Sequence, residues 1–183
     1  MNKIMSQAKL IYDDLITIRR TIHSNPEVGA KLPKTKAYVI DKLKEFGYEP
    51  QEICESGVVA TISGKNPGKT FLLRADMDAL PVVEATECDF KSTNGSMHAC
   101  GHDMHTAMLL GAAKLLRENQ DDIEGTVKLV FQPDEEGFTG AKKMLAAGVL
   151  ENPHVDAAMA MHVHSGTPSN MVLCGLGTSI ARS

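Results

Sequence analysis

The chain has 183 residues, 43% of them hydrophobic and 23% charged, which suits one soluble globular domain or part of a larger one. A net charge of −4, no basic run and only 4% aromatic residues argue against a nucleic-acid or anionic-membrane partner. The sequence shows neither a signal peptide nor a stretch of about 18 apolar residues, and its four widely spaced cysteines favour reduced thiols and a cytoplasmic location.

The N-terminal part of the chain predicts two amphipathic helices. Over residues 4–24, apolar side chains recur every three or four positions, which is the period of a helix with one buried face. Pro26 ends this helix, because a proline biases the residue before it away from the helical conformation. A second helix is predicted over residues 34–46, with Pro33 near its start.

Two strands are predicted next, over residues 57–63 and 70–75. The turn residues at 64–68 lie between them, a pattern that predicts a β-hairpin. Residues 76–101 have little periodicity and many turn-forming residues. A compact domain rarely keeps an irregular stretch of about 25 residues without a functional reason.

Helices and strands alternate from Met104 onward. A helical pattern follows Met104, and apolar strands are predicted over 125–131 and 155–161, with a short helix over 139–147 between them. A last short strand is predicted at 171–174. This order favours a parallel arrangement with helices on both faces. We therefore predict an α/β fold in which a mixed, largely parallel sheet is covered by helices.

Polar side chains that could bind a metal follow the predicted strands. The stretch from His98 to His105 alone holds three histidines, a cysteine and an aspartate, a ligand set that suits zinc or a similar transition metal. In open α/β sheets, ligands bind beyond the carboxyl ends of the strands, so we expect four clusters to meet at one rim. The clusters are Arg74, Asp76 and Asp78; Cys100, His102, Asp103 and His105; Gln132, Asp134, Glu135 and Glu136; and His162 and His164.

The adjacent carboxylates of Glu135 and Glu136 suggest a division of labour. Consecutive residues after a strand point in alternate directions, so one glutamate can bind a metal while its neighbour faces a bound water. A glutamate beside such a water can serve as general base, because the metal lowers the pKa of the water toward neutrality. In isolation, the same residues would be interpreted as a solvated acidic turn.

Five runs of sequence together resemble one known family. They are Ile22–Gly29 (IHSNPEVG), Leu73–Pro81 (LRADMDALP), Met97–His105 (MHACGHDMH), Phe131–Gly137 (FQPDEEG) and Met161–His162. The chain resembles the amidohydrolase branch of the co-catalytic metallopeptidases related to aminoacylase and carboxypeptidase G. That branch includes hippurate hydrolases, N-acyl-amino-acid amidohydrolases, indoleacetyl-amino-acid hydrolases and thermostable carboxypeptidases. The resemblance implies a catalytic domain of the zinc-peptidase type.

The resemblance implies a role for each matching residue. The implied metal ligands are Cys100, His102, Glu136 and His162. Glu135 is the implied general base, which activates the water that attacks an amide carbonyl. The implied cofactors are two divalent ions, which could be zinc, manganese, cobalt or nickel. The implied substrate is a small molecule, either an N-acyl-amino acid or a short peptide.

Other polar residues are expected to support the ligands. The candidates for such contacts are Asp76, Asp78, Asp103 and His105. Asp78 would orient a ligand histidine, and Asp76 stands where the wider clan has a metal-binding histidine. His105 is the weaker candidate for a ligand. We expect His98 to form hydrogen bonds within its loop, and His23 to have a structural role at the end of a helix.

The resemblance also bears on domain organisation. Residues 1–183 would be the N-terminal part of the catalytic domain, with the lid and dimerisation domain and the C-terminal part of the catalytic domain absent. Full-length relatives are expected to form homo-oligomers through the lid. One alternative is therefore a truncated, catalytically incompetent metal-binding fragment, or a subunit that needs a second half. Another is a single structural zinc held by Cys100, His102 and His105, which would leave metal binding independent of Glu136 and His162.

Overall fold

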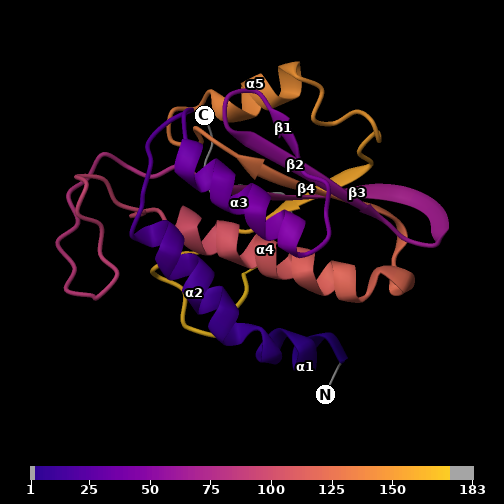
Figure 1. Ribbon diagram of the computed structural model, residues 1–183, viewed down its shortest axis with the longest axis horizontal. Coiled ribbons are helices and arrows are strands. Elements are labelled where there is room, and N and C mark those ends of the chain that lie inside the picture. The colour runs from indigo at the N-terminus through magenta and orange to yellow at the C-terminus, as the bar shows by residue number, and fades with distance from the viewer. Residues whose placement is uncertain (1–2, 174–183) are drawn as a thin grey trace.

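The computed structural model describes residues 3–173, which form one five-stranded sheet with helices on both faces (Figure 1). The first elements are α1 (Lys3–Leu10), α2 (Tyr12–His23), α3 (Pro33–Glu45), β1 (Gln51–Ile53), β2 (Gly57–Ser63) and β3 (Asn66–Asp76). They are followed by α4 (His102–Glu118), the 3-10 helix η1 (Gln120–Asp122), β4 (Glu124–Gln132), α5 (Gly140–Ala146) and β5 (Ala157–Ala160). The long segment between β3 and α4 is irregular, as predicted.

The strand order in the sheet is β1-β2-β4-β3-β5. β3 runs parallel to both β4 and β5, whereas β2 runs antiparallel to both β1 and β4. The predicted α/β fold with a mixed sheet covered by helices is therefore confirmed. None of the described helices is long and apolar enough to cross a membrane.

The predicted hairpin between residues 57–63 and 70–75 is wrong, because β4 lies between these two strands. β4 is buried on both faces: Leu129 and Phe131 enter one core, and Val130 enters the other. A strand buried on both faces also needs hydrogen-bond partners along both edges, and only a central place in the sheet supplies them.

Gly64, which directly follows β2, lets the start of β4 lie close beside it. The backbone N–H of Gly64 donates to the carbonyl oxygen of Gly125 at 2.9 Å. A Cβ atom on Gly64 would lie 1.7 Å from the carbonyl oxygen of Ile123. Gly64 therefore permits a close contact between backbones, rather than only the tight turn that the pattern suggested.

Two further predictions differ from the structure. The helix predicted over residues 4–24 is interrupted at Ile11 and forms α1 and α2. Because of this break, α1 contacts the C-terminal end of α4. There Asn119 donates a hydrogen bond to the Oε1 atom of Gln7 at 3.0 Å. Of the strand predicted at 171–174, the first three residues are not in a strand, and the fourth lies outside the described residues.

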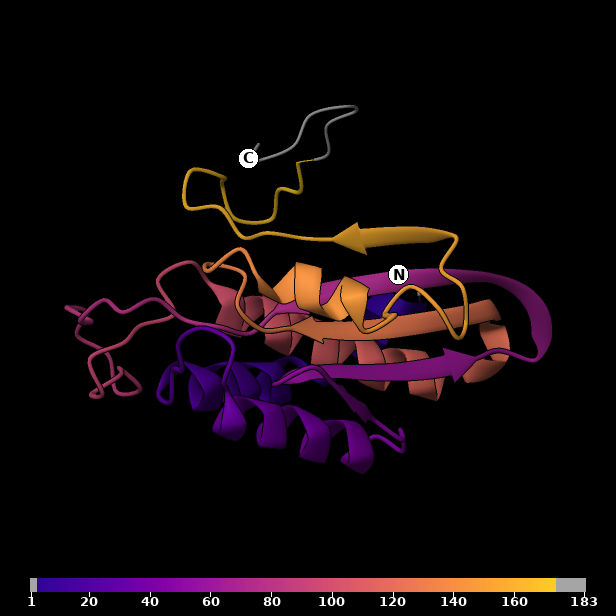
Figure 2. The same ribbon diagram turned by 90° about the horizontal axis from the view of Figure 1, so that it is seen from above.

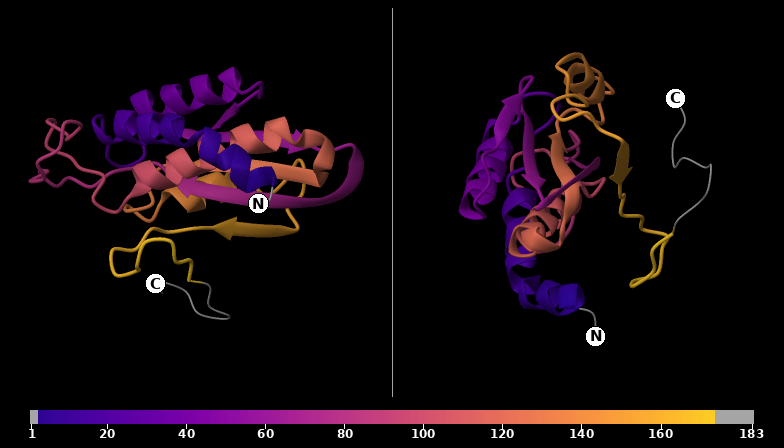
Figure 3. Two further views of the ribbon diagram at one scale, coloured as in Figure 1. Left: turned by 90° about the horizontal axis from the view of Figure 1, so that it is seen from below. Right: turned by 90° about the vertical axis from the view of Figure 1, so that its right-hand side faces the viewer.

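The two faces of the sheet have separate apolar cores. The larger core lies between the sheet and helices α2, α3 and α4. The smaller core lies beneath α5 and is formed by Leu72, Val130, Met144 and Val149. Figures 2 and 3 show β5 at one edge of the sheet, where all four of its residues are exposed. The strands β3, β4 and β5 all run toward one end of the sheet, where the polar clusters lie.

Candidate metal centre

The carboxyl ends of β3, β4 and β5 meet the N-terminus of α4. The parallel register puts Asp76, the last residue of β3, opposite Gln132, the last residue of β4. Gly101 precedes α4 with a φ of +85°, a backbone conformation that suits glycine and turns the chain between Cys100 and His102. This arrangement agrees with the expectation that the polar clusters following these strands meet at one rim of the sheet.

His102 lies at the centre of three overlapping groups of possible ligands. Its partners in these groups are Cys100 with His162, Glu135 with Glu136, and Asp76 with His105. Within each group, one possible ligand atom from each residue lies within 4.8 Å of the others.

Distances define the implied ligand set more closely. The Nε2 atom of His102 lies 3.8 Å from Oε1 of Glu136 and 3.8 Å from Oε2 of Glu135. The Sγ atom of Cys100 lies 3.4 Å from Nε2 of His162. The structure therefore brings together all four implied ligands and the implied general base.

Two of these atoms are buried without a hydrogen-bond partner among the described residues. They are Nε2 of His102 and Oε1 of Glu136. A buried polar atom without a partner typically costs about 1–3 kcal/mol, so native proteins rarely keep one without a reason. A cation between these atoms would satisfy both, and thiolate, imidazole and carboxylate together suit a divalent transition metal. The residues fit such an ion.

The surroundings of His102 prepare one ring nitrogen for a cation. Its Nδ1 atom donates a hydrogen bond to the backbone carbonyl oxygen of Asp78 at 2.8 Å, which leaves Nε2 free to bind. Burial by itself would lower the pKa of His102, but the hydrogen bond to Asp78 and the carboxylates of Asp78 and Asp76 raise it above its ordinary value. Negative charge that favours a proton on this ring also favours a bound cation.

Asp78 also holds the turn that follows β4. Its two carboxylate oxygens accept the backbone N–H groups of Glu135 at 2.9 Å and of Glu136 at 3.1 Å. Asp78 is 1% exposed, so this hydrogen bonding takes place in a dry environment. Asp78 therefore contacts both the candidate ligand His102 and the backbone of the two glutamates.

The Cys100 thiol is poorly suited to act alone as a nucleophile. Burial, together with the neighbouring carboxylates of Glu136, Glu135 and Asp76, raises the pKa of Cys100 to about 12. A thiol needs its thiolate form for nucleophilic attack, and a metal ion would stabilise that form. The geometry therefore favours Cys100 as a metal ligand.

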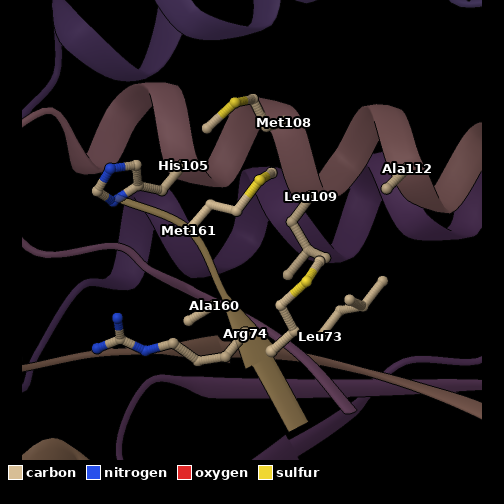
Figure 4. Close-up of a pocket in the computed structure, with 9 residues that line it drawn as sticks. Leu73, Arg74, His105, Met108, Leu109, Ala112, Ala160 and Met161 are labelled. Atoms are coloured by element: carbon tan, nitrogen blue, oxygen red, sulfur yellow. The ribbon is translucent and has the colours of Figure 1, made fainter. Parts of the chain in front are cut away.

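Asp76 and His105 form a pair beside the candidate ligands. The Nδ1 atom of His105 lies 2.6 Å from Oδ1 of Asp76, and Arg74 donates to Oδ2 of Asp76 at 2.6 Å. Burial would raise the pKa of Asp76, but the hydrogen bond from His105 and the charge of Arg74 hold it at about 2. Figure 4 shows His105 and Arg74 at one end of an apolar pocket of about 120 Å³ between α4 and β5.

The structure places Asp103 away from the candidate ligands. Its Oδ2 atom accepts hydrogen bonds from Arg19 at 2.7 Å and from Nδ1 of His23 at 2.8 Å. The Nε2 atom of His23 lies 3.0 Å from Oε1 of Glu84. This buried network ties α2 to α4 and to the irregular segment, which agrees with a structural role for His23. The sequence did not predict a role for Glu84, because it lies in the irregular segment between β3 and α4, where no pattern indicates burial.

His98 does not form the hydrogen bonds expected of it. It is 4% exposed, and neither ring nitrogen has a hydrogen-bond partner among the described residues. Burial lowers the pKa of His98 to about 4, so the ring is neutral at pH 7. His98 is therefore buried in the fold, although exposed residues lie on either side of it in the chain.

Sequence comparison identifies the family to which this arrangement belongs. Residues 72–177, more than half of the chain, match the peptidase family M20/M25/M40. The chain belongs to this family. Its match to the M20 family includes the ends of β3, β4 and β5 and the start of α4, which are the elements that carry the candidate ligands.

Individual relatives support the same assignment. The chain is 46% identical over 186 residues to thermostable carboxypeptidase 2 of Saccharolobus solfataricus, covering 99% of this chain and 47% of the relative. It is 43% identical over 155 residues to the N-acyl-L-amino acid amidohydrolase of Geobacillus stearothermophilus, covering 83% of this chain and 41% of that protein. The chain spans about half the length of the curated relatives it matches, or less.

A solved structure shows the same fold. The crystal structure of Bacillus subtilis YxeP, a dinuclear metal-binding peptidase of the M20 family, superposes with a TM-score of 0.83 at 40% sequence identity. The match covers 87% of this chain and 45% of that one. The predicted fold type and the resemblance to metal-dependent amidohydrolases and carboxypeptidases are therefore confirmed.

Proposed function

We propose that this chain carries the metal-binding half of an enzyme that hydrolyses the amide bond of N-acyl-amino acids or small peptides. The observation that carries the proposal is the convergence of Cys100, His102, Glu136 and His162 around buried atoms that lack partners. The names of the relatives support the reaction class, since they include a carboxypeptidase and an N-acyl-amino-acid amidohydrolase.

The four ligand residues would hold two divalent ions, the number described for YxeP. Zinc, manganese, cobalt and nickel all suit a mixed set of thiolate, imidazole and carboxylate ligands. When bound, such ions polarise an amide carbonyl and make a water more acidic. Asp78 would keep the ligands in place through its hydrogen bonds to His102 and to the backbone of Glu136.

Glu135 is the proposed general base. Its side chain is 35% exposed, whereas that of His102 is 1% exposed, so Glu135 lies on the solvent side of the cluster. Its carboxylate would take a proton from the water whose oxygen forms the new bond to the amide carbon. As the C–N bond breaks, the same proton would pass to the leaving nitrogen. Glu136 would meanwhile remain a ligand, which is the division of labour inferred for the pair.

The test compares Glu135→Gln with Glu136→Gln. Both variants keep the size of the side chain and remove one charge. We expect Glu135→Gln to retain metal and to lose hydrolysis of an N-acyl-amino acid by roughly 10²- to 10⁴-fold, the usual effect of removing a general base. Glu136→Gln should lose metal in elemental analysis. Undiminished hydrolysis by Glu135→Gln would overturn the assignment.

A second candidate is a metal-binding subunit that does not turn over substrate by itself. Two observations favour it: the chain spans about half the length of its relatives, and all residues of the edge strand β5 are exposed. On this hypothesis, the lid and the rest of the catalytic domain are supplied by further chain or by a second protein, and oligomers form through that lid. Bound metal without hydrolysis by the unaltered chain would support this candidate.

The proposal also includes the binding partners of the protein and its location in the cell. A small-molecule substrate, without nucleic acid or membrane, fits the net charge of −4. A cytoplasmic location fits the three cysteines of the described region, all of which are free thiols. Cell fractionation tests the location directly.

A further inference from the structure

His105 links two segments that lie far apart in the sequence. Its Nδ1 atom pairs with Oδ1 of Asp76 at 2.6 Å, and its Nε2 atom pairs with the backbone N–H of Val163 at 2.9 Å. A backbone N–H can only donate, so Nε2 must be the acceptor. The single proton of the neutral ring therefore lies on Nδ1, where it is donated to Asp76.

Asp76 is itself held in one orientation. Arg74 donates to its Oδ2 atom at 2.6 Å and, through Nε, to Oε1 of Gln132 at 2.9 Å. These contacts join the ends of β3 and β4 and leave Oδ1 of Asp76 directed at His105. Both Asp76 and His105 are at most 3% exposed, so water does not compete for these hydrogen bonds.

The other partner of His105 is the segment that carries His162. Val163 directly follows His162, and the rings of His105 and His162 lie 4.6 Å apart between centroids at an angle of 66°. His162 is otherwise exposed and lies beyond the exposed strand β5. A Cβ atom on Gly101 would lie 2.4 Å from Cγ2 of Val163, so Val163 also packs against the turn that leads into α4.

We propose that His105 is a positioning residue, which holds the backbone next to His162 so that His162 faces Cys100 and His102. Asp76 and Arg74 serve this role by fixing the proton of His105 on Nδ1. The inference rests on the proposed function only in treating His162 as a metal ligand. It also explains why His105 is not itself a ligand, since both of its ring nitrogens are already used.

Two variants separate the two hydrogen bonds of His105. In His105→Gln, the side-chain amide oxygen reaches the position of Nε2 and can still accept the N–H of Val163. In His105→Asn, the amide nitrogen takes the place of Nδ1 and can still donate to Asp76, but nothing reaches Val163. Removing a residue that orients a ligand typically lowers metal affinity by about 10- to 100-fold. We expect this loss for His105→Asn, similar to that of His162→Ala, and a much smaller loss for His105→Gln.

The experiment titrates the protein with cobalt(II) and follows its visible absorption. Absorption from the bond between cobalt and the Cys100 thiolate should persist in His105→Asn, while the bands that report coordination number change as they do in His162→Ala. Equal affinities and spectra for His105→Asn and the unaltered protein would overturn the proposal. Equal losses in His105→Asn and His105→Gln would also overturn it, because packing alone would then explain them.

A second measurement needs no variant to fold and no substrate. In ¹⁵N-labelled, metal-free protein, NMR distinguishes the two ring nitrogens of each neutral histidine, and we expect His105 to be protonated on Nδ1. A proton on Nε2 would overturn the proposal. Neither measurement involves hydrolysis, so a failure of Glu135 as general base would leave the result for His105 unchanged.

Discussion

The backbone carbonyl oxygen of Asp78 accepts a hydrogen bond from His102, while the carboxylate of Asp78 accepts the N–H groups of Glu135 and Glu136. Helix α4 and the turn after β4 are therefore both positioned by one residue just beyond β3. No hydrogen bond joins His102 to either glutamate in the described structure, so Asp78 is the link that sets their separation.

Replacing Asp78 should therefore affect metal binding and stability together. Asp78→Ala leaves two backbone N–H groups without acceptors, which should lower the free energy of unfolding by about 1–3 kcal/mol. Metal affinity should fall by about 10- to 100-fold, because the ligands lose their support. Urea unfolding and metal titration measure the two effects. Asp78→Asn keeps one acceptor oxygen and should be intermediate, and equal behaviour of both variants and the unaltered protein would contradict the role.

Divalent ions should stabilise the protein against heat. An ion that binds only the folded state, at a free concentration of 100 times its Kd, adds about 2.7 kcal/mol of stability. We expect zinc or manganese to raise the Tm and a chelator to reverse the change. Differential scanning fluorimetry of Cys100→Ser and Glu136→Gln should show a smaller rise. An unchanged rise in Glu136→Gln and His162→Ala would instead support a single structural zinc held by Cys100, His102 and His105.

Asp76 should make stability depend on pH in the acid range. Burial opposes its ionisation, but His105 and Arg74 lower the pKa of the folded carboxyl from 3.8 to about 2. A carboxyl with a depressed folded pKa contributes stability that is fully present above pH 4 and is lost as pH falls through about 2. The contribution is about 2 kcal/mol for a shift of this size.

Urea unfolding of metal-free protein between pH 2 and pH 6 measures this contribution. Asp76→Asn should be less stable at pH 6 and should lose less stability on acidification than the unaltered protein. Parallel curves for the two proteins would show that Asp76 does not titrate as described. Asp156→Asn, which alters a part-buried hydrogen bond to the backbone of Thr70, provides a control away from the site.

Lys128 should matter for stability, although it lies far from the candidate ligands. Its side chain is 2% exposed, and its Nζ atom donates to the carbonyl oxygens of Val149, Glu151 and Pro153. Lys128→Met keeps the apolar stem but leaves buried acceptors without a donor, which should lower the free energy of unfolding by about 1–3 kcal/mol. Chemical denaturation measures the loss, with Lys143→Met as an exposed control. Metal affinity should change little, and a large decrease would indicate that the segment after α5 supports the site.

Local patterns in the sequence determined much of the fold and the candidate site. The apolar runs of β2 and β4 and the alternation of helices and strands predicted the elements, because burial imposes a period on each. Chemically distinctive residues such as Cys100 and Glu135 were recognisable because their types and spacing suit metal binding and base catalysis. That the clusters would meet also followed from the sequence, since parallel strands end at a common edge.

Only the tertiary structure decided which side chains support the ligands. The sequence could not show that β4 separates β2 from β3, because strand order depends on burial along the whole strand rather than on the turn between neighbours. Nor could it show that Asp103 pairs with His23 while His105 reaches Val163. Those hydrogen bonds join residues more than 55 positions apart, and which of them form is set by helix rotation and by competition for buried partners. The sequence determined which residues are candidate ligands, and packing determined which partners polar residues such as Asp103 and His105 contact.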